Sequence, residues 1–66
     1  MAYLVRDFDG SEWICDNEPF RDKYSKIWDG FTNGNMVELP AGTIRILTGK
    51  KITWDNEPFV FDEVIK

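Results

Sequence analysis

The stretch LVRDFDGSEWICDNEPFRD, residues 4–22, returns in altered form as TIRILTGKKITWDNEPFVF, residues 43–61. Seven of the nineteen aligned positions are identical, and they include the complete string Asp-Asn-Glu-Pro-Phe. Val5 and Phe8 are replaced by the apolar residues Ile44 and Leu47. This similarity predicts an internal repeat in which two related units share one core.

The first copy has the signals of a β-hairpin. Residues 3–8 are rich in strand-forming types, Asp9-Gly10 is a strong turn dipeptide, and residues 12–15 resume with Trp and Ile. The Asp-Asn-Glu-Pro string then ends the pairing, because proline has no amide hydrogen and Asx side chains close local turns.

The second copy allows two interpretations at its start. The repeat favours a strand over residues 43–48, whereas Thr43 and Gly49 are typical of the two ends of a short helical turn. Both remain open. Strands are expected over residues 52–54 and 59–65.

Between the copies, residues 20–28 have apolar side chains at helical spacing, which favours an irregular segment or one short helix. Asn33-Gly34 is typical of a hairpin turn with positive φ at both positions, and would join residues 27–32 to residues 35–39. The whole chain, residues 1–66, is therefore expected to be one small mainly β domain (β-rich α+β). It would consist of two related β-hairpin units with at most one or two short helical turns.

A domain of this length buries only about 60% of the surface that its unfolded chain exposes, so large side chains must stabilise a thin core. We expect that core to contain Trp13, Phe20, Ile44, Leu47, Trp54 and Phe59. Trp28, beside Tyr24 and two lysines, is expected to be exposed. The surplus of large apolar residues also favours a homodimer.

Charge and composition narrow the classes of function. The chain has 12 acidic and 8 basic residues and a net charge of −4, which argues against direct nucleic-acid binding and favours a partner with a basic surface. It has no His and one Cys, so it cannot form a Ser-His-Asp or Cys-His relay or a thiolate-imidazole zinc site. We therefore expect a non-enzymatic protein without metal or cofactor. A single cysteine, no leader-like start and no long apolar stretch favour a cytoplasmic protein that does not enter the membrane.

Two sets of residues are candidates for binding. The acidic residues of the repeated string could present matched turns to a basic partner: Asp16, Glu18, Asp55 and Glu57. The same residue types also serve ordinary turn roles. The alternative set could bind a nucleotide-like anion in a dimer cleft: Lys23, Tyr24, Lys26 and Trp28.

From Asn33 onward, the string NGNMVELPAGTIRILTGKKITWDNEPF resembles a pattern in small bacteriophage and prophage proteins. Its elements here are NG, VELP, GTI, a leucine and a glycine, TW and EP. The resemblance implies a protein of an infected or lysogenic bacterial host. It also implies an inhibitor that binds a host defence or nucleic-acid-processing protein, with a structural or accessory phage protein as the alternative.

Overall fold

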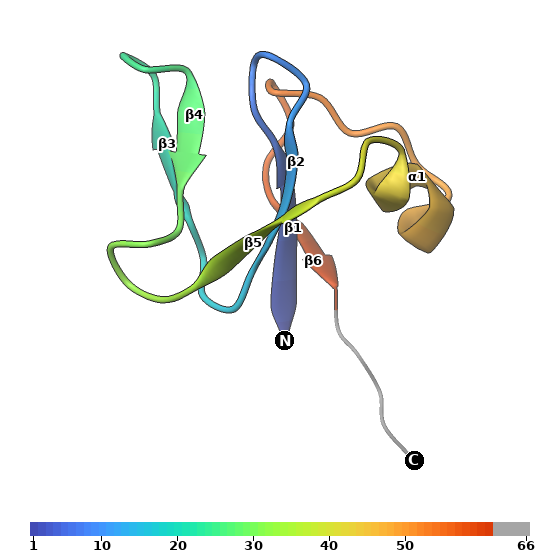
Figure 1. Ribbon diagram of the computed structural model, residues 1–66, viewed down its shortest axis with the longest axis horizontal. Helices are drawn as coiled ribbons and strands as arrows, with labels where there is room; N and C mark the ends of the chain where they lie inside the picture. Colours follow the sequence, from blue (N-terminus) through green and yellow to red (C-terminus); the bar gives the residue numbers. More distant parts are fainter. Residues whose placement is uncertain (62–66) are drawn as a thin grey trace.

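The computed structural model describes residues 1–61 (Figure 1). The elements, in chain order, are β1 (Ala2–Arg6), β2 (Glu12–Cys15), β3 (Phe20–Asp22), β4 (Ile27–Asp29), β5 (Met36–Leu39), α1 (Thr43–Thr48) and β6 (Phe59–Phe61). The expected mainly β fold with one short helix is confirmed.

Four of the strands form one antiparallel sheet in the order β5-β2-β1-β6, and β3 and β4 form a separate two-stranded hairpin. The predicted first hairpin is confirmed, because β1 pairs with β2 from Tyr3 opposite Cys15 to Arg6 opposite Glu12. Its turn uses Gly10 at φ 97°, whose N–H donates to the carbonyl of Asp7 at 3.0 Å.

Both faces of the four-stranded sheet are covered, because side chains alternate between the faces along each strand. On one face, Val5, Cys15 and Met36 pack against Trp28 of the β3–β4 hairpin. On the other face, Leu4 packs with Ile44 of α1 and with Ile52. The sheet is therefore the middle layer between a hairpin and a helix (Figure 1).

The expectation of an irregular or helical segment over residues 20–28 is wrong, because this segment is the β3–β4 hairpin. The carboxylate of Asp22 accepts the backbone N–H groups of Tyr24 and Ser25, and the N–H of Lys26 donates to the Asp22 carbonyl at 2.8 Å. Lys26 lies at φ 60°. This local Asx turn competes with the helical spacing of the apolar residues and prevails.

The expected hairpin around Asn33-Gly34 is also wrong. The strand before it, β4, pairs with β3, and the strand after it, β5, pairs with β2. Gly34 is not among the residues with positive φ. Its lack of a side chain serves close packing instead, because a Cβ at this position would overlap the side chains of Asp16 and Asn17.

The two copies of the repeat adopt different structures, so the expectation of two related hairpins holds only for the first. Residues 43–48, left open between strand and helix, form α1, which ends at Gly49 with φ 72°. The expected strand over residues 52–54 is absent from the described chain. The closing strand is present as β6, and the rest of the segment expected to extend to residue 65 lies outside the described residues.

The predicted core is confirmed in part. Ile44 is buried, and Trp13, Trp54 and Phe59 are half-buried. Phe20 and Leu47 are exposed, which corrects their assignment to the core. Trp28 was expected to be exposed, but its exposed fraction is only 4%. Its position on the inner side of the hairpin places the ring against the sheet.

Candidate functional site

Asp7 is a buried carboxylate at the junction of the sheet and the β3–β4 hairpin. Its Oδ1 accepts the backbone N–H of Trp28 at 2.8 Å, and its Oδ2 accepts the indole N–H of Trp13 at 3.0 Å. Burial raises the pKa of Asp7, while these two hydrogen bonds act in the opposite direction. Because both oxygens are used by internal donors, Asp7 has a structural role.

Beside Asp7, an arginine lies over two tryptophan rings, and we call this cluster of Arg21, Trp28 and Trp54 the cationic stack. The guanidinium of Arg21 lies 4.6 Å from the ring centre of Trp28 and 5.3 Å from that of Trp54. The two indoles meet edge to face at 5.8 Å. An Arg21 Nη donates to the carbonyl of Asn56 at 2.6 Å, so β3 is connected to the second Asp-Asn-Glu-Pro turn. The stack fills the space between the hairpin and that turn.

The first Asp-Asn-Glu-Pro turn organises the loop before β5. The carboxylate of Asp16 accepts the backbone N–H of Asn35 at 2.8 Å and its side-chain amide at 3.3 Å. These hydrogen bonds hold the pKa of Asp16 below its usual value. Asn33 donates to the carbonyl of Glu18, whose own side chain is exposed. Asp16 therefore acts in the turn, while Glu18 faces solvent.

The second turn has the same sequence but different hydrogen bonds. Here Asn56 closes the turn, because its side-chain oxygen accepts the backbone N–H of Thr53 at 2.7 Å and its own N–H donates to the Thr53 carbonyl at 3.1 Å. Asp55 and Glu57 are exposed. Identical residues thus build two turns of different geometry.

The four acidic candidates do not form one surface. Asp16 lies with Met1, Ala2 and Asn35 around one hollow, at the end of the sheet where β1 begins. Asp55 lies with Asp9 and Gly10 around another hollow, at the end where β1 finishes. Asp16 and Asp55 therefore lie apart, and the matched pair expected from the repeat is not assembled.

The alternative ligand set is also divided. Tyr24, a residue that is 97% exposed, lies in the turn of the β3–β4 hairpin between Lys23 and Lys26. The ammonium of Lys26 lies over the ring of Phe8 at 4.5 Å. Trp28 is buried between its own hairpin and the four-stranded sheet, so its ring is not available to stack on a ligand at the hairpin turn.

The chemistry of the remaining groups is limited. Cys15 is buried, and desolvation together with nearby carboxylates raises the pKa of its thiol to about 11, which disfavours the nucleophilic thiolate. Within residues 1–61, no group of three or more potential metal ligands comes together. The same residues contain no helix long and apolar enough to cross a membrane.

The four-stranded sheet has an open edge that the sequence pattern does not reveal. Within residues 1–61, β5 pairs only with β2 and forms the outer strand. Val37 on this strand is 61% exposed, and Glu38 is exposed. Phe31 is also exposed and contacts Trp13, the cross-strand neighbour of Glu38, with ring centres 6.4 Å apart. We use the name β5 edge for the outer side of this strand and the exposed residues near it, which are Asp16, Glu18, Phe31, Val37 and Glu38.

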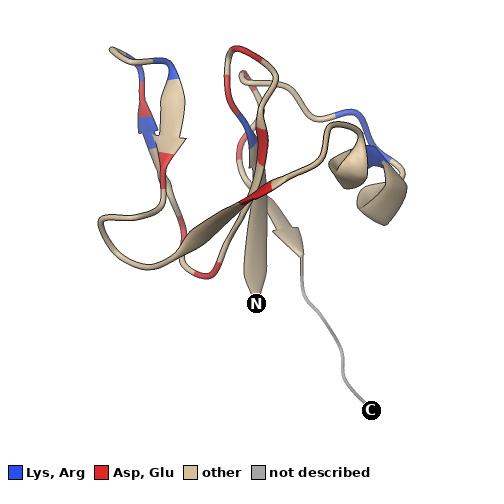
Figure 2. Cartoon of the chain, viewed as in Figure 1, with Lys and Arg blue, Asp and Glu red and all other residues tan. Residues whose placement is uncertain are grey.

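Charge is segregated on the molecule. The segments that supply β2 and β5, residues 12–20 and 27–44, contain acidic residues and no Lys or Arg. Basic residues lie at the end of β1, on β3 and the turn after it, on α1 and on the segment after α1 (Figure 2). The net charge and the composition do not reveal which strand lies at the edge of the sheet.

Comparisons with known proteins give no family for the chain. No protein-family model matches it, and neither does any curated protein or solved structure.

Proposed function

We propose that the protein is a non-enzymatic binding module that attaches to a basic, extended segment of another protein through the β5 edge. The observation that carries this proposal is the unpaired outer side of β5, beside exposed apolar and acidic side chains and without any neighbouring basic residue in sequence. An added strand satisfies the free backbone groups of an edge, and its side chains select the partner.

The hydrogen-bond alternation identifies which backbone groups the partner meets. The N–H of Asp16 donates to the carbonyl of Asn35 at 3.1 Å, just beyond the last cross-strand pair of β2 and β5. Bonded and non-bonded pairs alternate along an antiparallel ladder. The N–H groups of Val37 and Leu39 therefore face β2, and those of Met36 and Glu38 face outward to a partner.

Charge selects the chemistry of that partner. Glu38 on the strand and Glu18 near its start would attract Lys or Arg side chains on an incoming strand, while Val37 and Phe31 supply apolar contact. The resemblance to small phage proteins extends the proposal: the partner would be a host defence or nucleic-acid-processing protein in the bacterial cytoplasm, which the module would inhibit by occupying its surface.

Affinity capture from a bacterial lysate, with mass spectrometry and then calorimetry on the purified partner, tests this function. Glu38→Pro removes an outward amide, and proline is tolerated at such an edge position. Glu38→Gln is the matched variant that removes only the charge. We expect one stoichiometric partner, binding abolished by the proline variant and weakened with a reduced salt dependence by the glutamine variant.

Circular dichroism on each variant distinguishes lost binding from lost folding. Equal capture by wild type and by a folded Glu38→Pro variant would show that the β5 edge is not the binding surface. Failure to capture any protein would contradict the binding function itself and favour the accessory role.

A further inference from the structure

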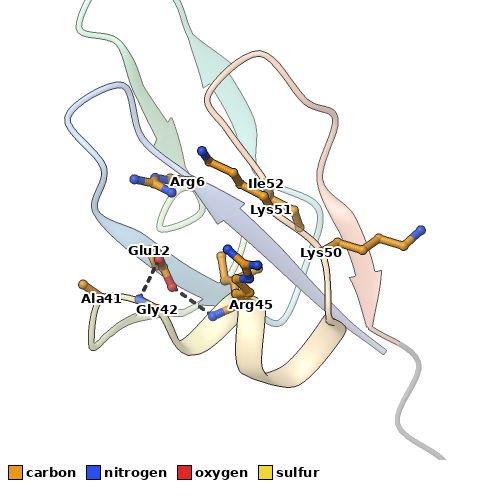
Figure 3. Close-up of a pocket in the computed structure, with 9 residues that line it drawn as sticks. Arg6, Glu12, Ala41, Gly42, Arg45, Lys50, Lys51 and Ile52 are labelled. Carbon is orange, nitrogen blue, oxygen red and sulfur yellow. Dashed lines mark hydrogen bonds between the residues drawn. The ribbon is translucent and has the colours of Figure 1, made fainter.

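A basic hollow lies on the other side of the sheet from the β3–β4 hairpin. It has a volume of about 180 Å³ and is formed by the end of β1, the start of β2, α1 and the segment after α1 (Figure 3). Four of its lining residues are basic and one is acidic: Arg6, Arg45, Lys50, Lys51 and Glu12. This concentration of positive charge contrasts with the net charge of −4 of the chain.

The single acid does not neutralise the hollow. Glu12 is 5% exposed, and its two oxygens accept the backbone N–H groups of Gly42 and Ile44, each at 2.9 Å. Arg6 is the cross-strand partner of Glu12, a position from which opposite charges commonly pair. Because the carboxylate is turned toward the backbone before α1, Arg6 forms no ion pair with it in the described structure.

The basic side chains differ in their positions. Arg45 extends from α1 over the hollow, Arg6 lies on the β1 side, and Lys50 is directed away (Figure 3). Arg6 and Lys51 also line the adjacent hollow that contains Asp9 and Asp55. Among residues 1–61, none of the four basic residues lies within salt-bridge distance of a carboxylate. Arg45 is therefore the cation most specific to this hollow.

We propose that this hollow binds the phosphate group of a small phosphorylated molecule. Guanidinium groups match phosphate oxygens with pairs of charge-assisted hydrogen bonds, and Arg6 and Arg45 offer two such groups. The hollow is smaller than the roughly 300–1,000 Å³ pockets that enclose whole drug-sized ligands, so it admits the phosphate and leaves the rest of the molecule outside. The N–H groups of Gly42 and Ile44 at the start of α1 already donate to Glu12, and that of Thr43 donates to the Pro40 carbonyl, so the basic side chains supply the phosphate contacts.

A titration of the full chain, followed by NMR of the backbone amides, tests the site. The probes are inorganic phosphate and a nucleoside monophosphate, with sodium chloride at matched ionic strength as the control. We expect saturable shifts at residues around the hollow with both phosphates and none with chloride. Tighter binding of the nucleotide would identify an organic phosphate as the ligand, and equal binding would identify the free ion. Either result supports the site, because both probes contain the phosphate group that the hollow is proposed to bind.

Substitutions then locate the binding. Arg45→Gln removes a cation from an exposed side chain and should weaken phosphate binding about tenfold or more. Lys50→Gln should have a smaller effect because its side chain points away. Lys23→Gln, on the β3–β4 hairpin, is the matched control and should bind phosphate like the wild type.

Several outcomes would overturn the proposal. These are shifts no different from those with chloride, an equal loss in Lys23→Gln and Arg45→Gln, or unchanged binding in Arg45→Gln. The site is independent of the proposed protein-binding function, because Glu38 lies on the acidic β5 edge and does not line the basic hollow. That variant should keep phosphate binding even where it loses the protein partner.

Discussion

Asp7 Oδ1 accepts a hydrogen bond from the backbone N–H of Trp28 at 2.8 Å, and this bond joins two parts of the fold that share no strand pairing. It places the Trp28 ring against Val5, Cys15 and Met36. The indole N–H of Trp28 also donates to the carbonyl of Arg6 at 3.2 Å. The β3–β4 hairpin is thus fixed to the sheet through a carboxylate and a tryptophan.

Replacement of Asp7 by Asn should destabilise the protein by about 1–3 kcal/mol, because one of the two N–H donors then faces an NH₂ group instead of an acceptor. Urea unfolding followed by tryptophan fluorescence measures this change. Asp9→Asn is the control, since an Asn oxygen can still accept the N–H of Ser11 in the exposed turn. An equal effect of both substitutions would contradict the junction role of Asp7.

Truncation of Trp28 to Ala should cost about 3–5 kcal/mol, enough to unfold a domain of this size. Trp54→Ala, for which the sequence alone suggests a core position, should cost less because Trp54 is only half-buried. Thermal melts of the two variants compare these losses. The order would be reversed if Trp54 were the main anchor of the core.

Substitution of Arg21 by Lys should lower stability by about 1–2 kcal/mol, because Lys keeps the charge but loses the planar stack on Trp28 and Trp54. The hydrogen bond to the Asn56 carbonyl would also be weakened. Urea unfolding tests this, with Lys23→Arg as the reverse exchange at an exposed site on the same hairpin. No difference between the two variants would show that the stack adds no stability beyond its charge.

How far the sequence predicts this fold depends on the range of each interaction. The Asp9-Gly10 turn and the β1–β2 hairpin follow from adjacent residues and were predicted correctly. The buried position of Trp28 depends on Asp7, which is 21 residues away in the chain, and the sequence contains no local signal for it. The repeat predicts the same structure for both copies, and this is wrong. The second copy begins with α1, where the Glu12 carboxylate of β2 accepts backbone N–H groups, and the start of the first copy has no such contact.

The candidate sites show the same division. That the acidic residues of the repeated string lie in turns is a local property, and the sequence predicts it. Whether the two turns meet depends on the order of the strands, which separates Asp16 from Asp55. The exposed side of β5 and the gathering of Arg6 with Arg45 likewise arise only when distant segments pair.

The acid sensitivity of the fold should reflect the turn carboxylates. The pKa of Asp29 is held below its usual value mainly by a hydrogen bond from the Thr32 hydroxyl. The backbone N–H groups of Thr32 and Phe31 act in the same direction. The folded state then binds fewer protons than the unfolded state, so this stability is present above the ordinary carboxyl range and is lost as pH falls through the lowered pKa. Asp7 acts in the opposite sense: its contribution is present below the ordinary range and is lost as pH rises through its raised pKa.

Asp29→Asn should therefore lower stability at neutral pH and flatten the loss of stability between about pH 5 and pH 2. Urea unfolding at a series of pH values gives this slope. Curves for wild type and variant that remain parallel through the acid range would show that the carboxylate of Asp29 is not linked to folding.

Glu12→Gln tests the contact that distinguishes the second copy of the repeat from the first. The carboxylate accepts two backbone N–H groups at the start of α1, one on each oxygen. A glutamine side chain has one oxygen and one NH₂ group, so one of the two N–H groups would face a donor instead of an acceptor. We expect a loss of about 1–2 kcal/mol and faster amide hydrogen exchange confined to α1 and the segment after it. Glu38→Gln, on the neighbouring strand but exposed, is the matched control and should change neither quantity. If α1 kept its exchange protection in Glu12→Gln, the helix would be held by Ile44 packing against Leu4 instead of by the carboxylate.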